Sequence, residues 1–152
     1  MRRSEKEISD PEIIRSVFER GDICRLGLIN KGLAYIVPMN FGYKGGYLYF
    51  HSANEGTKID LLKQNPKVSF EVDINHVINK AESACNWGAS YISVIGSGTI
   101  EFIKNHKEKE RALKLIMEKY SGRKEWTFSK KNVDQTAIFT LLIKEISCKG
   151  SL

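Results

Sequence analysis

The residues best suited to chemistry lie between positions 51 and 62, where a glycine, a threonine and a lysine precede an apolar edge. Gly56, Thr57 and Lys58 stand at the start of a predicted short helix, and Thr57 with Asp60 forms a capping-box pattern. Free N–H groups and the helix dipole favour an anion at such a position. Thr57 adds a hydroxyl and Lys58 a full positive charge. An ordinary helix cap with a surface lysine fits the same residues, so both interpretations stay open.

Other arrangements of reactive side chains are missing from the sequence. It contains no Gly-x-Ser-x-Gly, His-Glu-x-x-His, Walker loop or Gly-x-Gly-x-x-Gly pattern. A metal site from His51, His76 and Cys85 is conceivable, but their spacing is not that of a metal motif and we expect no metal. Cys85 could line a substrate opening, although a partly buried structural thiol is the simpler expectation. A chain without reactive side chains can take its chemistry from a cofactor.

The amino-acid composition limits the classes of binding partner that we expect. The net charge is +6, but the basic residues are densest between Lys104 and Lys131, where glutamates alternate with them. Interspersed charge of this kind is typical of a solvated helix and loop. No basic stretch is interleaved with aromatic residues, which argues against nucleic acid. The three cysteines form no Cys-x-x-Cys, and no apolar run reaches the ~20 residues of a membrane span. We expect a cytoplasmic protein without a nucleic-acid or membrane partner.

The elements that must position these residues are mostly strands. Asp10 and Pro11 predict a helix over about residues 11–20, and an apolar stripe predicts a second over about 105–120. Residues 74–89 read as an irregular loop. The first three strands, joined by short turns, predict a meander. The predicted strands cover residues 23–30, 33–41, 47–52, 67–73, 91–102 and 137–147.

Two glycines in the fifth predicted strand indicate strong curvature. Gly96 and Gly98 lie on one face, where glycine marks a bend or a close backbone approach. Closure of six mostly antiparallel strands into a barrel would remove the exposed edges. We therefore expect a mainly β protein with peripheral helices, a six-stranded antiparallel split β-barrel, with residues 1–152 in a single domain.

Taken in order along nearly the whole chain, several short motifs resemble the pyridoxamine 5'-phosphate oxidase-like FMN-binding split barrels, nearest the nitroimidazole-resistance reductases. The matching segments are Ile36-Val-Pro-Met-Asn40, Leu48-Tyr-Phe-His-Ser-Ala-Asn54, Gly56-Thr-Lys58, Asn65-Pro-Lys-Val68, Tyr91-Ile-Ser-Val-Ile95 with Gly98, and Ile146-Ser-Cys-Lys149. The chain departs from the family at Ile92, where relatives often carry arginine, and at Ser97, where they often carry phenylalanine. It also ends before the longer C-terminal segment of true pyridoxamine phosphate oxidases, so we do not expect vitamin B6 oxidation.

The resemblance implies roles for individual residues. Lys58, Gly56 and Thr57 would hold the FMN phosphate. The other implied cofactor contacts are the backbone of Val37, Pro38, Met39 and Asn40 along the flavin ring, His51 and Ser52 beside the ribityl chain or phosphate, and Ser93 and Val94 from across the site. His51 would also lie near the reaction centre, where it could donate a proton; an imidazole that only hydrogen-bonds the phosphate or backbone is the alternative. The cofactor would lie at a homodimer interface.

Two functions follow from this resemblance. The first is an FMN-dependent oxidoreductase that takes electrons from NADH or NADPH and reduces a small aromatic, quinone or nitro-aromatic substrate. The second is a flavin- or haem-binding carrier or redox sensor without turnover. Trp87, Tyr91 and Trp126 could stack on a flavin or substrate ring, although packing in a core or interface is the default expectation for such side chains.

Overall fold

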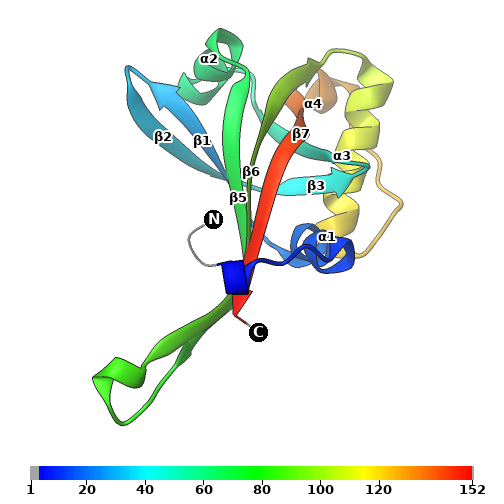
Figure 1. Cartoon of the computed structure of the whole chain (residues 1–152). Coiled ribbons are helices and arrows are strands. Elements are labelled where there is room, and N and C mark those ends of the chain that lie inside the picture. The colour runs from blue at the N-terminus through cyan, green and yellow to red at the C-terminus, as the bar shows by residue number, and fades with distance from the viewer. Residues whose placement is uncertain (1–3, 152) are drawn as a thin grey trace.

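The computed structural model describes residues 4–151 as one rolled antiparallel sheet with helices packed around it (Figure 1). Residues 1–3 of the charged N-terminus and residue 152 lie outside the described part. The strands are β1 (Cys24–Asn30), β2 (Leu33–Met39), β3 (Phe41–Lys44), β4 (Tyr47–Ala53), β5 (Lys67–Asn79), β6 (Gly88–Ile103) and β7 (Thr136–Ser151). The helices are α1 (Pro11–Arg20), α2 (Thr57–Gln64), α3 (His106–Ser121) and α4 (Lys130–Asp134), with short 3-10 turns η1 (Ser4–Lys6) and η2 (Ala84–Asn86).

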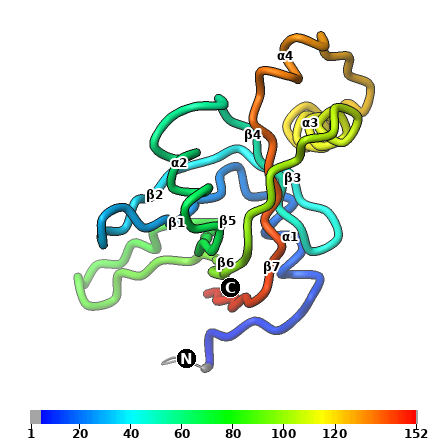
Figure 2. Tube along the Cα trace, turned by 90° about the horizontal axis from the view of Figure 1, so that it is seen from above, coloured from blue at the N-terminus to red at the C-terminus, as the bar shows by residue number. Residues whose placement is uncertain are grey.

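The sheet is rolled because the strands at its two edges follow one another in the chain. Its strand order is β2-β1-β5-β6-β7-β4-β3, so β2 and β3 are the outermost strands. Only Asn40 separates the end of β2 from the start of β3. Seen from above, the strands therefore curl around a common interior (Figure 2). This is a β-barrel split between two edges, as the sequence predicted.

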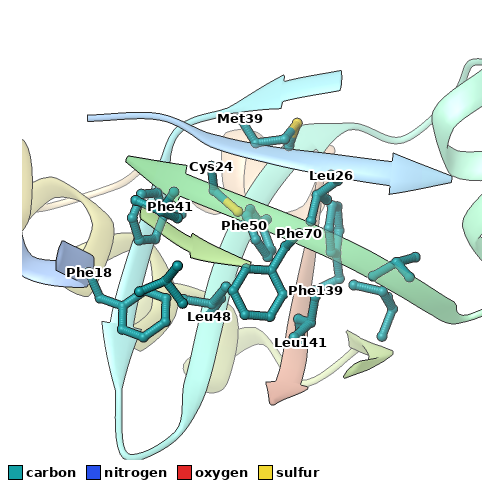
Figure 3. Close-up of a cluster of buried hydrophobic side chains, with 14 of the residues drawn as sticks. Phe18, Cys24, Leu26, Met39, Phe41, Leu48, Phe50, Phe70, Phe139 and Leu141 are labelled. Carbon is teal, nitrogen blue, oxygen red and sulfur yellow. The ribbon is translucent and has the colours of Figure 1, made fainter. Parts of the chain in front are cut away.

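Aromatic rings from distant parts of the chain fill the interior (Figure 3). The rings of Phe50 and Phe139 are stacked with centroids 5.4 Å apart, and Phe18 of α1 stacks on Tyr43 at 4.6 Å. Buried side chains alternate with half-buried or exposed ones along β1 and β4, as a strand with one buried face requires. Burial of these large apolar surfaces, at about 25 cal/mol per Å², is the main force that holds the roll together.

Two features of the predicted topology are wrong: the number of strands and the way in which the first three predicted strands pair. Residues 4–151 form seven strands instead of six, because the predicted strand over 33–41 breaks at Asn40 and Phe41–Lys44 pairs separately with β4. The meander is wrong: β2 pairs with β1 alone, and β4 pairs with β3 and β7. The tight turn at Lys31-Gly32 is confirmed, since both residues have positive φ. Local turn signals are visible in sequence, whereas pairing between distant strands is not.

The predicted loop over residues 74–89 is confirmed only for residues 80–87, because β5 extends to Asn79 and β6 begins at Gly88. β5 and β6 continue through this region as a two-stranded ribbon, with a register shift between Ile74 and Val77 and a positive φ at Asn75. We call residues 75–90 the β5–β6 arm; it projects from the body of the molecule (Figure 1). The alternation rule fails here because both faces of the arm are open to solvent. Cys85, at its tip, is exposed instead of partly buried.

Gly96 and Gly98 mark a close backbone approach, as expected. A Cβ atom at Gly96 would lie 2.5 Å from the carbonyl oxygen of Glu145 and 2.6 Å from the Phe70 ring. The β6–β7 register shifts between Ser97 and Gly98. The space that these glycines leave is taken by core side chains.

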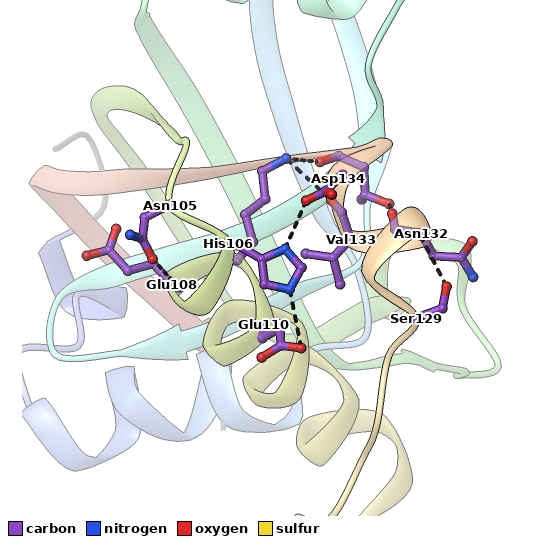
Figure 4. A network of polar contacts seen from close by, with 10 residues as sticks. Asn105, His106, Glu108, Glu110, Ser129, Asn132, Val133 and Asp134 are labelled. Carbon is purple, nitrogen blue, oxygen red and sulfur yellow. Dashed lines mark hydrogen bonds and ion pairs between the residues drawn. The ribbon is translucent and has the colours of Figure 1, made fainter.

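The helices α3 and α4 cover the outside of the sheet near β4 and β7 and are joined by polar contacts (Figure 4). The Nδ1 atom of His106 lies 2.9 Å from an Asp134 carboxylate oxygen, and the amine of Lys109 donates to the carbonyls of Val133 and Thr136. Sequence patterns missed α4 because it has only five residues and buries a single one, Val133. None of the described helices is long and apolar enough to cross a membrane.

Candidate functional site

The N-terminus of α2 lacks a side-chain cap. Gly56 is the N-cap residue with a φ of 117°, a conformation that favours glycine, and no side chain accepts a hydrogen bond from the first turn. The predicted capping box is therefore wrong, because Thr57 is already the first helical residue. The N–H groups of this turn remain available, and nothing lies within 4 Å of a Cβ built at Gly56. A small anion could approach this helix end directly.

Lys58, the second residue of α2, brings a positive charge to this helix end. Its side chain is half-buried, and its Nζ lies 3.1 Å from the thioether sulfur of Met39, a weak acceptor. No carboxylate forms an ion pair with it among the described residues. Burial lowers the pKa of Lys58, because the charged amine is partly removed from water. An anionic group at this point would relieve that penalty, so the donor set fits a phosphate.

His51 lies close enough to Lys58 to feel its charge. The pKa of His51 is lowered, first by burial and second by the positive charge of Lys58, so its imidazole is neutral near pH 7. It remains partly exposed on β4, where it pairs with Ile138 of β7. Ser52 follows on the opposite face and is half-buried. The structure thus brings His51 and Lys58 into one neighbourhood.

The segment Val37–Asn40 runs along an open edge of the sheet. β2 is hydrogen-bonded to β1 on one side only, so its other side presents backbone N–H and C=O groups without a strand partner. Pro38 is exposed there, in the edge position where a residue without an N–H is tolerated. The Met39 side chain is buried toward Lys58, and Val37 is half-buried. A planar heteroaromatic ring could bond to this edge.

Ser93 and Val94 lie elsewhere in the chain. They belong to β6, three strands away from β2 along the sheet. Val94 is fully buried and faces Val72 in the core, so its side chain has no surface to offer. Ser93 is half-buried on the opposite face of β6. No hydrogen bond or ion pair among the described residues joins either one to Lys58 or His51.

Sequence reasoning missed one contact and one residue that position this region. Met39 was expected to contribute its backbone, whereas its side-chain sulfur is what contacts the Lys58 amine. The Tyr120 hydroxyl accepts a hydrogen bond from the Phe41 amide at 3.0 Å and donates one to the Asp22 carbonyl at 2.7 Å, which fixes the start of β3 just after Asn40. In the sequence, Tyr120 is one member of the apolar stripe of α3. Its hydrogen-bond partners, Phe41 and Asp22, lie too far away in sequence to be inferred.

The Lys58 region is separate from the cavity of about 530 Å³ between α3 and β4. That cavity is lined by residues such as Tyr47, Tyr49 and Leu115 and does not include Lys58.

Comparisons with known proteins show the family and the fold. The family model described as pyridoxamine 5'-phosphate oxidase matches residues 10–150. A candidate 5-nitroimidazole antibiotic resistance protein from Bacteroides thetaiotaomicron is 30% identical, with a TM-score of 0.85 over 95% of this chain and 86% of that one. The flavocytochrome Anf3 from Azotobacter vinelandii shares the fold, with 21% identity and a TM-score of 0.86 over 100% of this chain and 72% of that one.

The curated relative covers less of the chain. An uncharacterised protein of Rhizobium meliloti is 38% identical over 61 residues, which is 40% of each chain. The family model, by contrast, spans almost every described residue, from the cap of α1 to the end of β7. The chain therefore belongs to the pyridoxamine 5'-phosphate oxidase family.

Proposed function

We propose that this protein is an FMN-dependent oxidoreductase that works as a homodimer with the flavin at the subunit interface. NADH or NADPH is the electron donor, and a small aromatic, quinone or nitro-aromatic compound is the substrate. The half-buried, uncompensated cation of Lys58 at an uncapped helix end carries this proposal, because it matches the charge and size of a terminal phosphate. The family and its 30% identical nitroimidazole-resistance relative support it.

Each part of the site has a distinct task in this proposal. Lys58, the Thr57 hydroxyl and the first-turn N–H groups of α2 hold the phosphate. The free backbone of Val37–Asn40 holds the polar edge of the ring, while His51 and Ser52 lie beside the ribityl chain. When bound, the flavin supplies the chemistry: it accepts a hydride from the nicotinamide and passes electrons to the substrate.

Ser93 and Val94 approach the flavin from the second subunit in this arrangement. Val94 can contribute only its backbone, because its side chain is fully buried. His51 holds a proton on its imidazole when the pH falls toward its lowered pKa, and it can release that proton to a reduced substrate. The exposed position of the imidazole on β4 leaves it accessible to a small molecule.

A flavin- or haem-binding carrier or sensor without turnover is the second candidate. The shared fold of the flavocytochrome favours it. Absorption spectra separate the two functions: a yellow preparation that NADH or NADPH bleaches without oxygen, and that reoxidises with a nitro-aromatic, is an enzyme. A yellow preparation that neither nicotinamide bleaches is a carrier or sensor.

The anion site is tested with Lys58→Ala. Loss of a hydrogen-bonded charge contact of about 1.5–3 kcal/mol should weaken FMN binding by roughly 10- to 100-fold. Quenching of flavin fluorescence on titration measures the dissociation constant. Lys63→Ala is the matched control, since Lys63 is an exposed lysine near the other end of α2. Equal FMN affinity in Lys58→Ala and the wild type would show that the phosphate binds elsewhere.

A further inference from the structure

The cavity of about 530 Å³ lies beneath the middle of α3, against the face of β4 and β7 that points away from the core. Polar contacts fix the helix on both sides of this space. In the first half of α3, the Lys109 amine donates to the carbonyls of Val133 and Thr136. In its last turn, the Lys119 amine donates to the Phe18 carbonyl at 2.7 Å. A helix tethered in this way is not free to settle into the gap below it.

The side chains on either side of the gap keep it open and give it an aromatic wall. A Cβ atom at Gly42 of β3 would lie 3.1 Å from the Leu115 Cγ, so α3 approaches the sheet most closely over a residue without a side chain. On the next strand, the rings of Tyr47 and Tyr49 line the cavity with their centroids 6.4 Å apart. Ala112 of α3 also lines it, and its single methyl group leaves the space in front of the rings empty.

The cavity holds a buried hydroxyl group that has no partner. Thr140 of β7 is only 9% exposed and is the one buried polar side chain in residues 4–151. Its Oγ1 makes no hydrogen bond within that part of the chain. No fully enclosed side-chain oxygen or nitrogen there lacks a partner, so this oxygen opens into the cavity that Thr140 lines. Burial of a hydroxyl in such a place is costly unless a ligand hydrogen-bonds to it.

The rim of the cavity carries uncompensated positive charge. The exposed cations that line it and form no ion pair within residues 4–151 are Lys44, Arg111 and Lys114. Two carboxylates lie there as well, but Glu118 is paired with Lys124 at 3.7 Å, which leaves Glu108 alone. The balance favours an anion, and the planar guanidinium of Arg111 can bind a carboxylate through two parallel hydrogen bonds.

We propose that this cavity binds a small aromatic carboxylate of one or two rings, with a hydroxyl or carbonyl group at the end opposite the carboxylate. The carboxylate lies at the rim beside Arg111, the ring packs against Tyr47 and Tyr49, and the second polar group reaches Thr140. The volume is within the range of about 300–1,000 Å³ that is usual for small-molecule sites. The lining contains no residue of the proposed flavin site, so this inference does not depend on the proposed function.

Isothermal titration calorimetry with two probes tests both polar contacts. The probes are para-biphenylcarboxylate and its analogue with a hydroxyl at the para position of the second ring. The wild type should bind the hydroxylated probe more tightly by roughly three- to tenfold, the value of one hydrogen bond. Thr140→Val should remove this preference, because valine keeps the shape of the side chain and lacks the hydroxyl. Arg111→Gln should weaken both probes by about threefold or more, since each carries the carboxylate.

Lys107→Gln is the matched control, because Lys107 is exposed on the same helix and does not line the cavity. It should bind both probes as the wild type does. Absence of binding by the wild type, a preference for the hydroxylated probe that persists in Thr140→Val, or equal affinities in Arg111→Gln and Lys107→Gln would overturn the inference.

Unfolding and competition separate this site from the fold and from the flavin site. Thr140→Val should keep or raise the urea midpoint of unfolding, because its hydroxyl has no partner in the fold. Added FMN should leave the affinity for both probes unchanged. A lower midpoint, or displacement of the probes by FMN, would contradict the inference. A protein that binds the probes as expected but ignores FMN would overturn the proposed function and leave this site standing.

Discussion

At the scale of single residues, the electrostatics of the site come from Lys58 and His51, neither of which forms an ion pair with a carboxylate among residues 4–151. Lys58 is held by a sulfur atom, and its charge acts on His51. Each of the two prefers its neutral form more than it would in water, because burial penalises the charge. A bound dianionic phosphate reverses that preference for both. Binding of the phosphate and protonation of His51 should therefore support each other.

The proton-donor role of His51 predicts a pH dependence. The lowered pKa places the rise of the imidazolium form below the ordinary value of 6.5, so the rate of nitro-aromatic reduction should increase as the pH falls through that range. His51→Gln should lose this increase while FMN affinity stays within about threefold of the wild type. Steady-state rates between pH 5 and pH 8, with an anaerobic nicotinamide donor, measure it.

His76→Gln is the control for that experiment, because His76 is an exposed histidine on the arm. It should keep the wild-type profile. If His51→Gln and the wild type show the same dependence on pH, His51 does not donate the proton and only contacts the cofactor.

The anion site could be predicted at this scale, because Gly56, Thr57 and Lys58 are neighbours in sequence. The contact between Lys58 and Met39 could not, since it joins residues 19 positions apart through the closure of the barrel. The predicted capping box is wrong because it placed the cap at Thr57, one position after the true cap. The N-cap residue is Gly56, which has a positive φ.

At the scale of elements, local signals were accurate and pairing was not. Asp10 accepts from the amide of Glu12 at 2.9 Å and begins α1 as expected, and the Lys31-Gly32 turn joins β1 to β2. The separation of β2 from β4 depends on the whole sheet, so no local pattern reveals it. The arm was missed for a related reason. Its two strands pair with each other, but neither face is buried, so the sequence lacks the alternation of apolar and polar residues that predicts a strand.

The curvature of β6 gives a prediction for this scale. Gly96→Ala should lower the free energy of unfolding by about 1–3 kcal/mol, because the new methyl group would overlap the Glu145 carbonyl and the Phe70 ring. Gly88→Ala, in the same strand with open space around it, should change stability little. Urea unfolding followed by circular dichroism compares the two. Equal midpoints would mean that β6 can move away from β7 without cost.

At the scale of the whole molecule, assembly and cofactor binding should be coupled. If the flavin lies between two copies of the chain, as proposed, the chain must bind FMN more tightly as a dimer than as a monomer. The dissociation constant for FMN should therefore rise several-fold when the chain is diluted below its own dimer dissociation constant. Fluorescence titration at two chain concentrations measures this change. One and the same FMN affinity for dilute and concentrated wild-type chain would mean that each copy binds the cofactor alone.

The free edge of β2 also affects how readily the protein aggregates in concentrated solution. A row of unpaired backbone groups flanked by aliphatic side chains is a template onto which any extended peptide can add as an extra strand. A flavin ring bound along Val37–Asn40 would block this edge, so that other chains could not pair with it. Protein without the bound ring should therefore aggregate, measured as turbidity, under conditions in which the barrel is still folded.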